Sequence, residues 1–110
     1  PIVRLGDVFD VSGGKRLPKG ALYASSPTDH PYLRVVDMKS GTFAMDGLKY
    51  LTSDVHSKIS RYVVKSGDLV ISIAGTIGSV AVVPSMLDGA NLTENAARLR
   101  PRAGVMIDPH

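Results

Sequence analysis

The sequence contains no cysteine and no tryptophan. Without cysteine the chain forms no disulfide and offers no thiolate to a metal, which is typical of proteins from a reducing compartment. It also lacks any apolar run near the roughly 20 residues that a membrane-spanning helix needs. The first residues do not show the basic segment followed by an apolar one that marks a signal peptide. We therefore expect a cytoplasmic protein without membrane contact.

Residue types that carry catalysis are sparse or badly spaced. His30, His56 and His110 have no ligand partner three or four positions away, so their spacing does not indicate a metal site. We interpret His30 as a loop residue and His56 as a solvated helix residue. Glu94 is the only glutamate, and no two acidic residues are spaced as an acid and base pair. We expect a chain that is not an enzyme and binds no cofactor itself.

The length and charge of the chain are those of one mildly basic domain. A chain of 110 residues can bury roughly two thirds of its unfolded surface in a single core. The formal net charge is +3 and the pI is about 9.4. This charge permits DNA binding without establishing it.

The clearest local pattern is a turn followed by a strand. In the turn, Gly67 supplies a positive φ and Asp68 a side-chain acceptor. Residues 69–73 then alternate with a period of two, which predicts a strand with one well-buried face. The apolar residues that share that face are Leu69, Ile71 and Ile73.

A glycine-rich reversal, residues 74–78, leads into a return strand. Its apolar residues Val80, Val82 and Val83 end at Pro84, which cannot donate to a central ladder. The reversal reads as a tight turn whose glycines serve the backbone. A role in contacting DNA stays open for it, because short hydroxyls and exposed N–H groups bind phosphates.

Further elements complete a pattern in which strands outnumber helices. Residues 32–36 and 48–51 predict strands, and Gly41 marks a turn between them. A helix is expected from Ser53, which caps it. Residues 12–31 form a long loop rich in glycine, serine and proline, and loops of this length are usually functional or disordered.

Several segments, in this order, carry a resemblance to a known family. They are R-L-G-D-V-F-D-V-S-G-G-K (4–15), P-Y-L-R-V-V-D-M (31–38), L-K-Y-L-T (48–52), G-D-L-V-I-S (67–72) and G-A-N-L-T-E-N-A-A-R-L-R-P (89–101). The ordered set resembles the target recognition domain of the specificity (S) subunit of type I restriction-modification enzymes. The resemblance covers nearly the whole chain, although no single segment is specific by itself.

The resemblance implies a fold, a function and partners. The fold is a mixed α/β domain, mainly β, with a curved, partly barrel-like sheet and one or two short helices. The function is sequence-specific recognition of one half of a split double-stranded DNA site. Catalysis then belongs to partner methylation (M) and restriction (R) subunits, which bind S-adenosylmethionine, ATP and Mg. Residues 1–110 are expected to be a single truncated recognition domain, because in the family an I-D-P segment such as 107–109 leads further into the domain.

Candidate DNA contacts follow from residue chemistry. An arginine bonds O6 and N7 of guanine together, and Arg34 is our candidate for that role, against the alternative of a solvated strand face. Asn91 and Asn95 have the chemistry to read adenine, although such residues are as often turn formers. The cations expected to contact phosphates are Lys15, Arg16, Lys19 and Lys39. The hydroxyls expected to do so at the strand reversal are those of Ser72, Thr76 and Ser79.

Two other functions stay open at this point. One is the recognition domain of a fused adenine methyltransferase-endonuclease. The other is a small β-rich protein-interaction module, which a flat salt response and no DNA affinity would favour.

Overall fold

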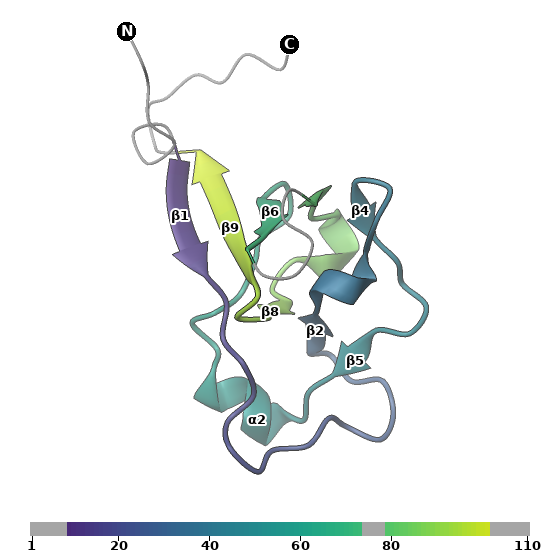
Figure 1. Cartoon of the computed structure of the whole chain (residues 1–110). Coiled ribbons are helices and arrows are strands. Elements are labelled where there is room, and N and C mark those ends of the chain that lie inside the picture. The colour runs from purple at the N-terminus through teal and green to yellow at the C-terminus, as the bar shows by residue number, and fades with distance from the viewer. Residues whose placement is uncertain (1–8, 74–78, 102–110) are drawn as a thin grey trace, which may run out of the picture.

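The structure, a computed structural model, describes residues 9–73 and 79–101 and consists mainly of short strands (Figure 1). The strands are β1 (Phe9–Gly13), β2 (Pro31–Leu33), β3 (Met38–Lys39), β4 (Thr42–Phe43), β5 (Lys49–Tyr50), β6 (Leu69–Ser72), β7 (Val80–Val82), β8 (Asn91–Leu92) and β9 (Ala96–Pro101). The helical segments are α2 (Ser53–Lys58) and the 3-10 helices η1 (Val35–Asp37) and η2 (Ser85–Leu87). This confirms the predicted mixed, mainly β fold. In the described ranges, no helix is long and apolar enough to cross a membrane.

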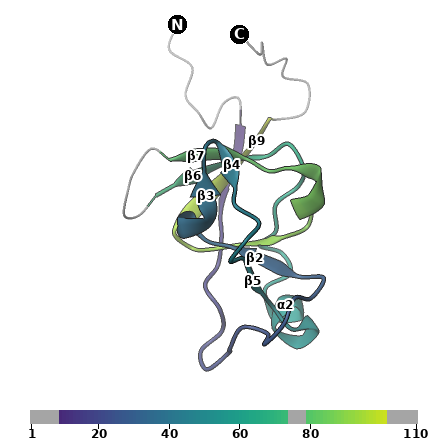
Figure 2. The same ribbon diagram turned by 90° about the vertical axis from the view of Figure 1, so that its right-hand side faces the viewer.

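Four strands form an antiparallel sheet in the order β1-β9-β6-β7. In its register, Asp10 faces Arg100 and Ser12 faces Arg98 across β1 and β9. Figures 1 and 2 show this sheet at one end of the molecule and α2 at the other. The last described strand therefore lies between the first strand and β6.

The remaining strands form two smaller sheets. One has the order β5-β2-β8, with β2 parallel to β8, and the other is the β3–β4 hairpin. The hairpin turns at Gly41, whose φ of +80° confirms the predicted turn. The N–H of Val82 donates to the carbonyl of Gly41 at 2.8 Å and fixes the hairpin to β7 (Figure 2). Among the described strands, the sheets do not close into a barrel.

The buried face of β6 is the opposite of the predicted one. Val70 is fully buried and Ser72 is 1% exposed, whereas Ile73 is 54% exposed. On the neighbouring strand, Ala81 faces Val70 and is buried, while Val82 is 48% exposed. Both faces of β6 carry aliphatic side chains, so alternation identified a strand but did not decide which face packs against the core.

Two predicted element boundaries were also wrong. The helix is capped by Thr52, whose hydroxyl accepts from the N–H of Val55 at 3.2 Å, so Ser53 is its first residue and not its cap. The strand predicted over residues 32–36 ends at Leu33, because the chain then turns into η1. Arg34 therefore precedes a helical turn and does not belong to a strand face.

Gly14 lies where the chain leaves β1 and passes close to the segment between β8 and β9. Its N–H donates to the carbonyl of Ala96 at 3.1 Å, and the N–H of Lys15 donates to that of Leu92 at 2.8 Å. A Cβ at Gly14 would clash with the carbonyl oxygens of Leu92 and Thr93. The close approach of the two backbones therefore requires glycine at this position.

We predict that Gly14→Ala lowers the free energy of unfolding by about 1–3 kcal/mol, the usual cost of overpacking. Gly13→Ala is the matched control, because a Cβ there has no atom within 4 Å. The control is expected to stay within about 0.5 kcal/mol of wild type in urea unfolding. Equal losses of unfolding free energy in Gly14→Ala and Gly13→Ala would contradict the close approach of the Gly14 backbone to Leu92 and Thr93.

The turn before β6 is as predicted and also holds a buried ion pair. Gly67 has a φ of +88°, and Asp68 accepts from the N–H of Lys65 at 2.8 Å. Arg100 adds two parallel hydrogen bonds to the Asp68 carboxylate, at 2.9 and 2.7 Å. Burial on its own raises the pKa of Asp68, but the hydrogen bonds from Arg100 and Lys65 outweigh burial, and the pKa is lowered. The carboxylate therefore joins the turn to β9.

This lowered pKa makes the contribution of Asp68 to stability dependent on pH. The contribution is present above the unfolded pKa of about 3.9 and is lost as the pH falls through the lower folded value. Asp68→Asn is expected to cost about 3 kcal/mol in urea unfolding at pH 7, at the low end for breaking a buried pair because the Arg100 side chain is 28% exposed. The difference in unfolding free energy between wild type and Asp68→Asn is expected to be smaller at pH 3 than at pH 7.

The control for this experiment is Asp54→Asn, which removes an exposed pair with Lys58 at 3.6 Å. Its cost is expected to stay below about 1 kcal/mol. A deficit of Asp68→Asn that is the same at pH 7 and pH 3 would contradict the ionic contribution.

Candidate nucleic-acid interface

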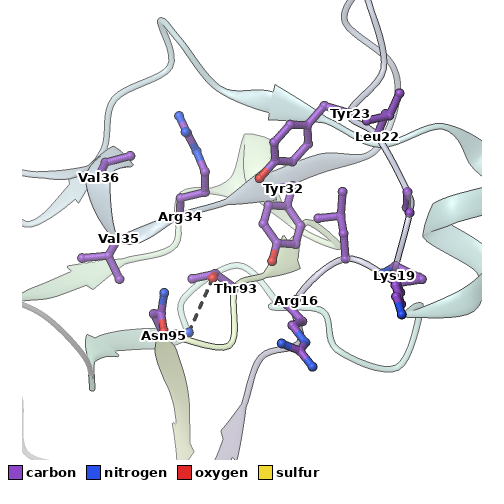
Figure 3. Close-up of a pocket in the computed structure, with 14 residues that line it drawn as sticks. Arg16, Lys19, Leu22, Tyr23, Tyr32, Arg34, Val35, Val36, Thr93 and Asn95 are labelled. Atoms are coloured by element: carbon purple, nitrogen blue, oxygen red, sulfur yellow. Dashed lines mark hydrogen bonds between the residues drawn. The ribbon is translucent and has the colours of Figure 1, made fainter.

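A cavity of about 920 Å³, here called the loop cavity, lies between the long loop, η1 and the segment before β9 (Figure 3). Its lining includes residues 16–23, 32, 34–36, 93 and 95. Four of the predicted DNA contacts line it together: Arg16, Lys19, Arg34 and Asn95. The fold thus brings side chains from three distant segments to one concave surface.

Arg34 is held in a fixed position at the edge of the loop cavity. Its Nε donates to Asp37 Oδ2 and its Nη2 to Asp37 Oδ1, each at 3.2 Å. The same Nη2 donates to the carbonyl of Gly47 at 3.2 Å. Asp37 is 4% exposed and also accepts from the backbone N–H of Arg34 at 3.0 Å. The carboxylate therefore anchors the guanidinium from the protein side.

This anchoring determines which donors Arg34 can present. Nη1 has no acceptor among the described residues, so both of its N–H groups are available. A paired contact with guanine through Nη1 and Nη2 requires Nη2 to release Gly47, at a cost of about 0.5–1.5 kcal/mol. The hydrogen bonds to Asp37 stay intact in that arrangement. Base reading by Arg34 remains a prediction. The hydrogen bonds described here define which nitrogens would contact the base.

Two tyrosines form the wall between the loop and β2. The Tyr32 hydroxyl donates to the carbonyl of Lys15 at 2.9 Å, and burial raises the pKa of this phenol. Tyr23 is 39% exposed, and its ring centroid lies 5.8 Å from that of Tyr32. The ammonium group of Lys49 lies 5.8 Å from the Tyr23 ring centroid. The buried tyrosine fixes the start of the loop, and the exposed one presents an aromatic ring beside the Lys49 ammonium group.

Asn95 is exposed on the opposite side of the loop cavity from Lys19 (Figure 3). Its backbone N–H contacts the hydroxyl of Thr93 at 3.5 Å. The N–H of Thr93 in turn donates to the carbonyl of Leu33 at 3.0 Å. Asn95 is thereby positioned by β2, the strand that leads to Arg34.

Sequence reasoning missed the apolar contribution to this surface. Leu22 is 80% exposed and Val36 is 65% exposed, and both line the loop cavity. An apolar residue within a polar loop is a weak signal, and single exposed aliphatics are common on protein surfaces. Here the two lie around one concavity with the tyrosines.

The other predicted contacts lie outside the loop cavity. Lys15 lines a second cavity of about 380 Å³, which Arg16, Lys19 and Lys58 also line. Lys39 is exposed on β3, and Ser79 precedes β7. The predicted contact at Thr76 lies outside the described residues.

The structure corrects the predictions for Asn91 and Ser72. Asn91 is fully buried, its Nδ2 donates to the carbonyl of Ile59 at 2.8 Å, and its Oδ1 lies 2.7 Å from His56 Nδ1. Ser72 is 1% exposed, and its N–H donates to Ser79. Neither side chain reaches solvent, so neither contacts DNA in this conformation.

The interpretation of His56 as a solvated residue holds only in part, because its side chain is half-buried. Its ring stacks on that of His30 with centroids 4.0 Å apart, in addition to its contact with Asn91. Asn91 donates through Nδ2 to a carbonyl, so its oxygen faces His56 and Nδ1 of His56 carries the proton. Among the described residues, no group of three His, Asp or Glu side chains is arranged to hold a metal.

Comparisons with known proteins agree with this architecture. The family model described as "Type I restriction modification DNA specificity domain" matches residues 2–101. Among solved structures, the HsdS subunit from Thermoanaerobacter tengcongensis superposes with a TM-score of 0.69 at 24% identity, over 94% of this chain. A chain from a study of complex assembly and conformational transition of the type I R-M system superposes with a TM-score of 0.71, also at 24% identity and over 94% of this chain. No curated protein matches the sequence.

The present chain spans 24% of the length of each of these two structures, and identity at this level shows a shared fold. The family match is broader evidence, because it covers 100 consecutive residues with the observed strands and both sides of the loop cavity. The chain belongs to the family of type I restriction modification DNA specificity domains.

Proposed function

We propose that this domain recognises one half of a split double-stranded DNA site through the loop cavity and the basic residues around it. The observation that carries the proposal is the convergence of Arg16, Lys19, Arg34 and Asn95 on one concave surface. Family membership supports the same function, because the family is defined by DNA specificity.

The residues of the surface supply the two kinds of contact that DNA recognition needs. Arg16 and Lys19 are exposed on a loop, where they attract phosphates without reading sequence. Arg34 and Asn95 present the donors and acceptors that distinguish base edges. Leu22 and Val36 provide apolar surface of the kind that contacts a thymine methyl group.

We further propose that the domain works within a specificity subunit and carries out no chemistry itself. The methylation and restriction subunits are the partners, and S-adenosylmethionine, ATP and Mg act in those partners. One of the two similar structures comes from a study of complex assembly in such a system, which supports this arrangement. A protein that acts on cellular DNA in this way works in the cytoplasm.

Lys19→Ala tests the phosphate contacts. For wild type, about four phosphate contacts predict that log K falls with log salt at a slope of roughly −3 to −4. Lys19→Ala is expected to weaken binding to all duplexes alike and to make the slope about one unit less steep. Fluorescence titrations at several salt concentrations measure both effects. A flat salt response of wild type would favour a protein-interaction module.

A test of base reading by Arg34 needs a variant in which the Asp37 carboxylate is not left buried without its partner. The double variant Arg34→Met with Asp37→Asn removes the guanidinium and the buried charge together. It is expected to relax preference at one base pair by about 1–3 kcal/mol on a library of randomised duplexes. Asp37→Asn alone is the matched control: it keeps the guanidinium but loosens its anchor, so it is expected to keep the same preferred base with a smaller loss of discrimination than the double variant. If the double variant keeps the full wild-type preference, Arg34 only joins η1 to Gly47, and bases are read elsewhere.

A further inference from the structure

A separate polar cavity lies between β1, β9 and the segment after α2. Its volume is about 470 Å³, and its lining consists of Ser12, Gly13, Arg61, Tyr62, Val63, Leu92 and Arg98. We call it the Arg98 cavity. It shares no lining residue with the loop cavity.

The guanidinium of Arg98 is the unusual feature of this cavity. Its side chain is 15% exposed, and its Nη1 is buried without a hydrogen-bond partner among the described residues. The nearest acidic oxygen, Asp10 Oδ2, lies 4.0 Å away, beyond hydrogen-bond distance. Buried donors are nearly always satisfied, so an unsatisfied guanidinium nitrogen beside a cavity indicates a missing acceptor.

The charge around the cavity has the sign that an anion requires. Arg61 is exposed and lies with its guanidinium carbon 5.7 Å from the Tyr62 ring centroid. The ammonium group of Lys15 lies 6.0 Å from the same ring. Two carboxylates act on Arg98: Asp10, whose side chain is 59% exposed, and the buried Asp68, whose charge is already matched by its two hydrogen bonds from Arg100. Solvent screens Asp10, and Arg100 neutralises Asp68, so the cavity keeps an excess of positive charge.

The walls of the cavity are held by backbone hydrogen bonds. The N–H of Leu92 donates to Tyr62 at 3.0 Å, and the carbonyl of Leu92 accepts from Lys15 at 2.8 Å. Across β1 and β9, Ser12 faces Arg98. Three segments are thus fixed around the guanidinium before any ligand arrives, which lowers the entropic cost of binding.

We propose that the Arg98 cavity binds a phosphate group of the DNA backbone, with Arg98 and Arg61 as its donors. Nη1 is buried in this conformation, so it donates to a phosphate oxygen after the Arg98 side chain turns toward the cavity, and no hydrogen bond of Nη1 has to be broken for this rotation. The planar fork of a guanidinium suits phosphate geometry. The cavity adds a phosphate contact from a largely buried arginine to those of the exposed Lys15 and Lys19 side chains. This inference rests on the proposed function, because it assigns the phosphate to DNA.

The first test uses inorganic phosphate, which needs no DNA. Phosphate titrated to saturation, against chloride at equal ionic strength, is expected to raise the Tm of the protein by several degrees. Arg61→Gln is expected to lose most of this Tm shift. Because the Arg61 side chain is exposed, this variant is expected to keep the fold. Arg98→Lys keeps the charge but removes the fork and is expected to lose the shift as well. Lys65→Gln is the matched control, since Lys65 is exposed and lines none of these three cavities.

The second test measures duplex DNA binding of the same variants at several salt concentrations. Arg61→Gln is expected to make the salt slope about one unit less steep. If both arginine variants keep the wild-type phosphate shift and salt slope, the inference is overturned while DNA binding by the domain stands. A lost phosphate shift with an unchanged slope also overturns it, because the cavity then holds free anions and not the DNA backbone. If wild type shows the phosphate shift but binds no duplex, the proposed function and the assignment to DNA both fail.

Discussion

The buried segment of residues 91–93 ties together the parts of the chain that carry the proposed contacts. Its backbone is hydrogen-bonded to Lys15, Leu33 and Tyr62, and its first side chain donates to the carbonyl of Ile59. Each of these groups is costly to leave unpaired in the interior, by about 1–3 kcal/mol. The long loop, the approach to η1 and the wall of the Arg98 cavity therefore have fixed origins, although most of the loop has no regular secondary structure. The absence of a side chain at Gly14 lets the loop run this close to the segment.

The arginines in the part of the chain that the structure describes fall into two groups, distinguished by whether a buried carboxylate satisfies them. Arg100 is paired with Asp68 and Arg34 with Asp37, and in each pair the carboxylate is almost fully buried. These pairs position backbone turns, and Arg34 has one nitrogen to spare. Arg16, Arg61 and Arg98 have no buried carboxylate as a partner within the described residues, and Arg98 lies 4.0 Å from the exposed Asp10. The first group positions turns of the fold, and the second contains the arginines to which we assign phosphate contacts.

Local chemistry in the sequence predicted the parts of the fold that depend on neighbouring residues. The turn at Gly67 and the start of α2, to within one residue, follow from side chains a few positions apart. The buried face of β6 did not follow, because it depends on which sheet packs against it. The burial of Asn91 likewise depends on Ile59, which is 32 positions away. The spacing of three between Arg34 and Asp37 was a readable signal for their ion pair, whereas the Arg98 cavity needs three segments that only the fold assembles.

We propose that duplex DNA binds the surface around the loop cavity and that the Arg98 cavity contributes a further phosphate contact. Amide chemical-shift changes during a titration with duplex DNA test it most directly, since every described residue except proline reports its own environment. The account predicts the largest changes at Arg16, Lys19, Asn95 and Arg98, and little change at the exposed β7 residues Val80 and Val82. Changes centred on β7, with residues 16–19 and 95–98 unaffected, would contradict it.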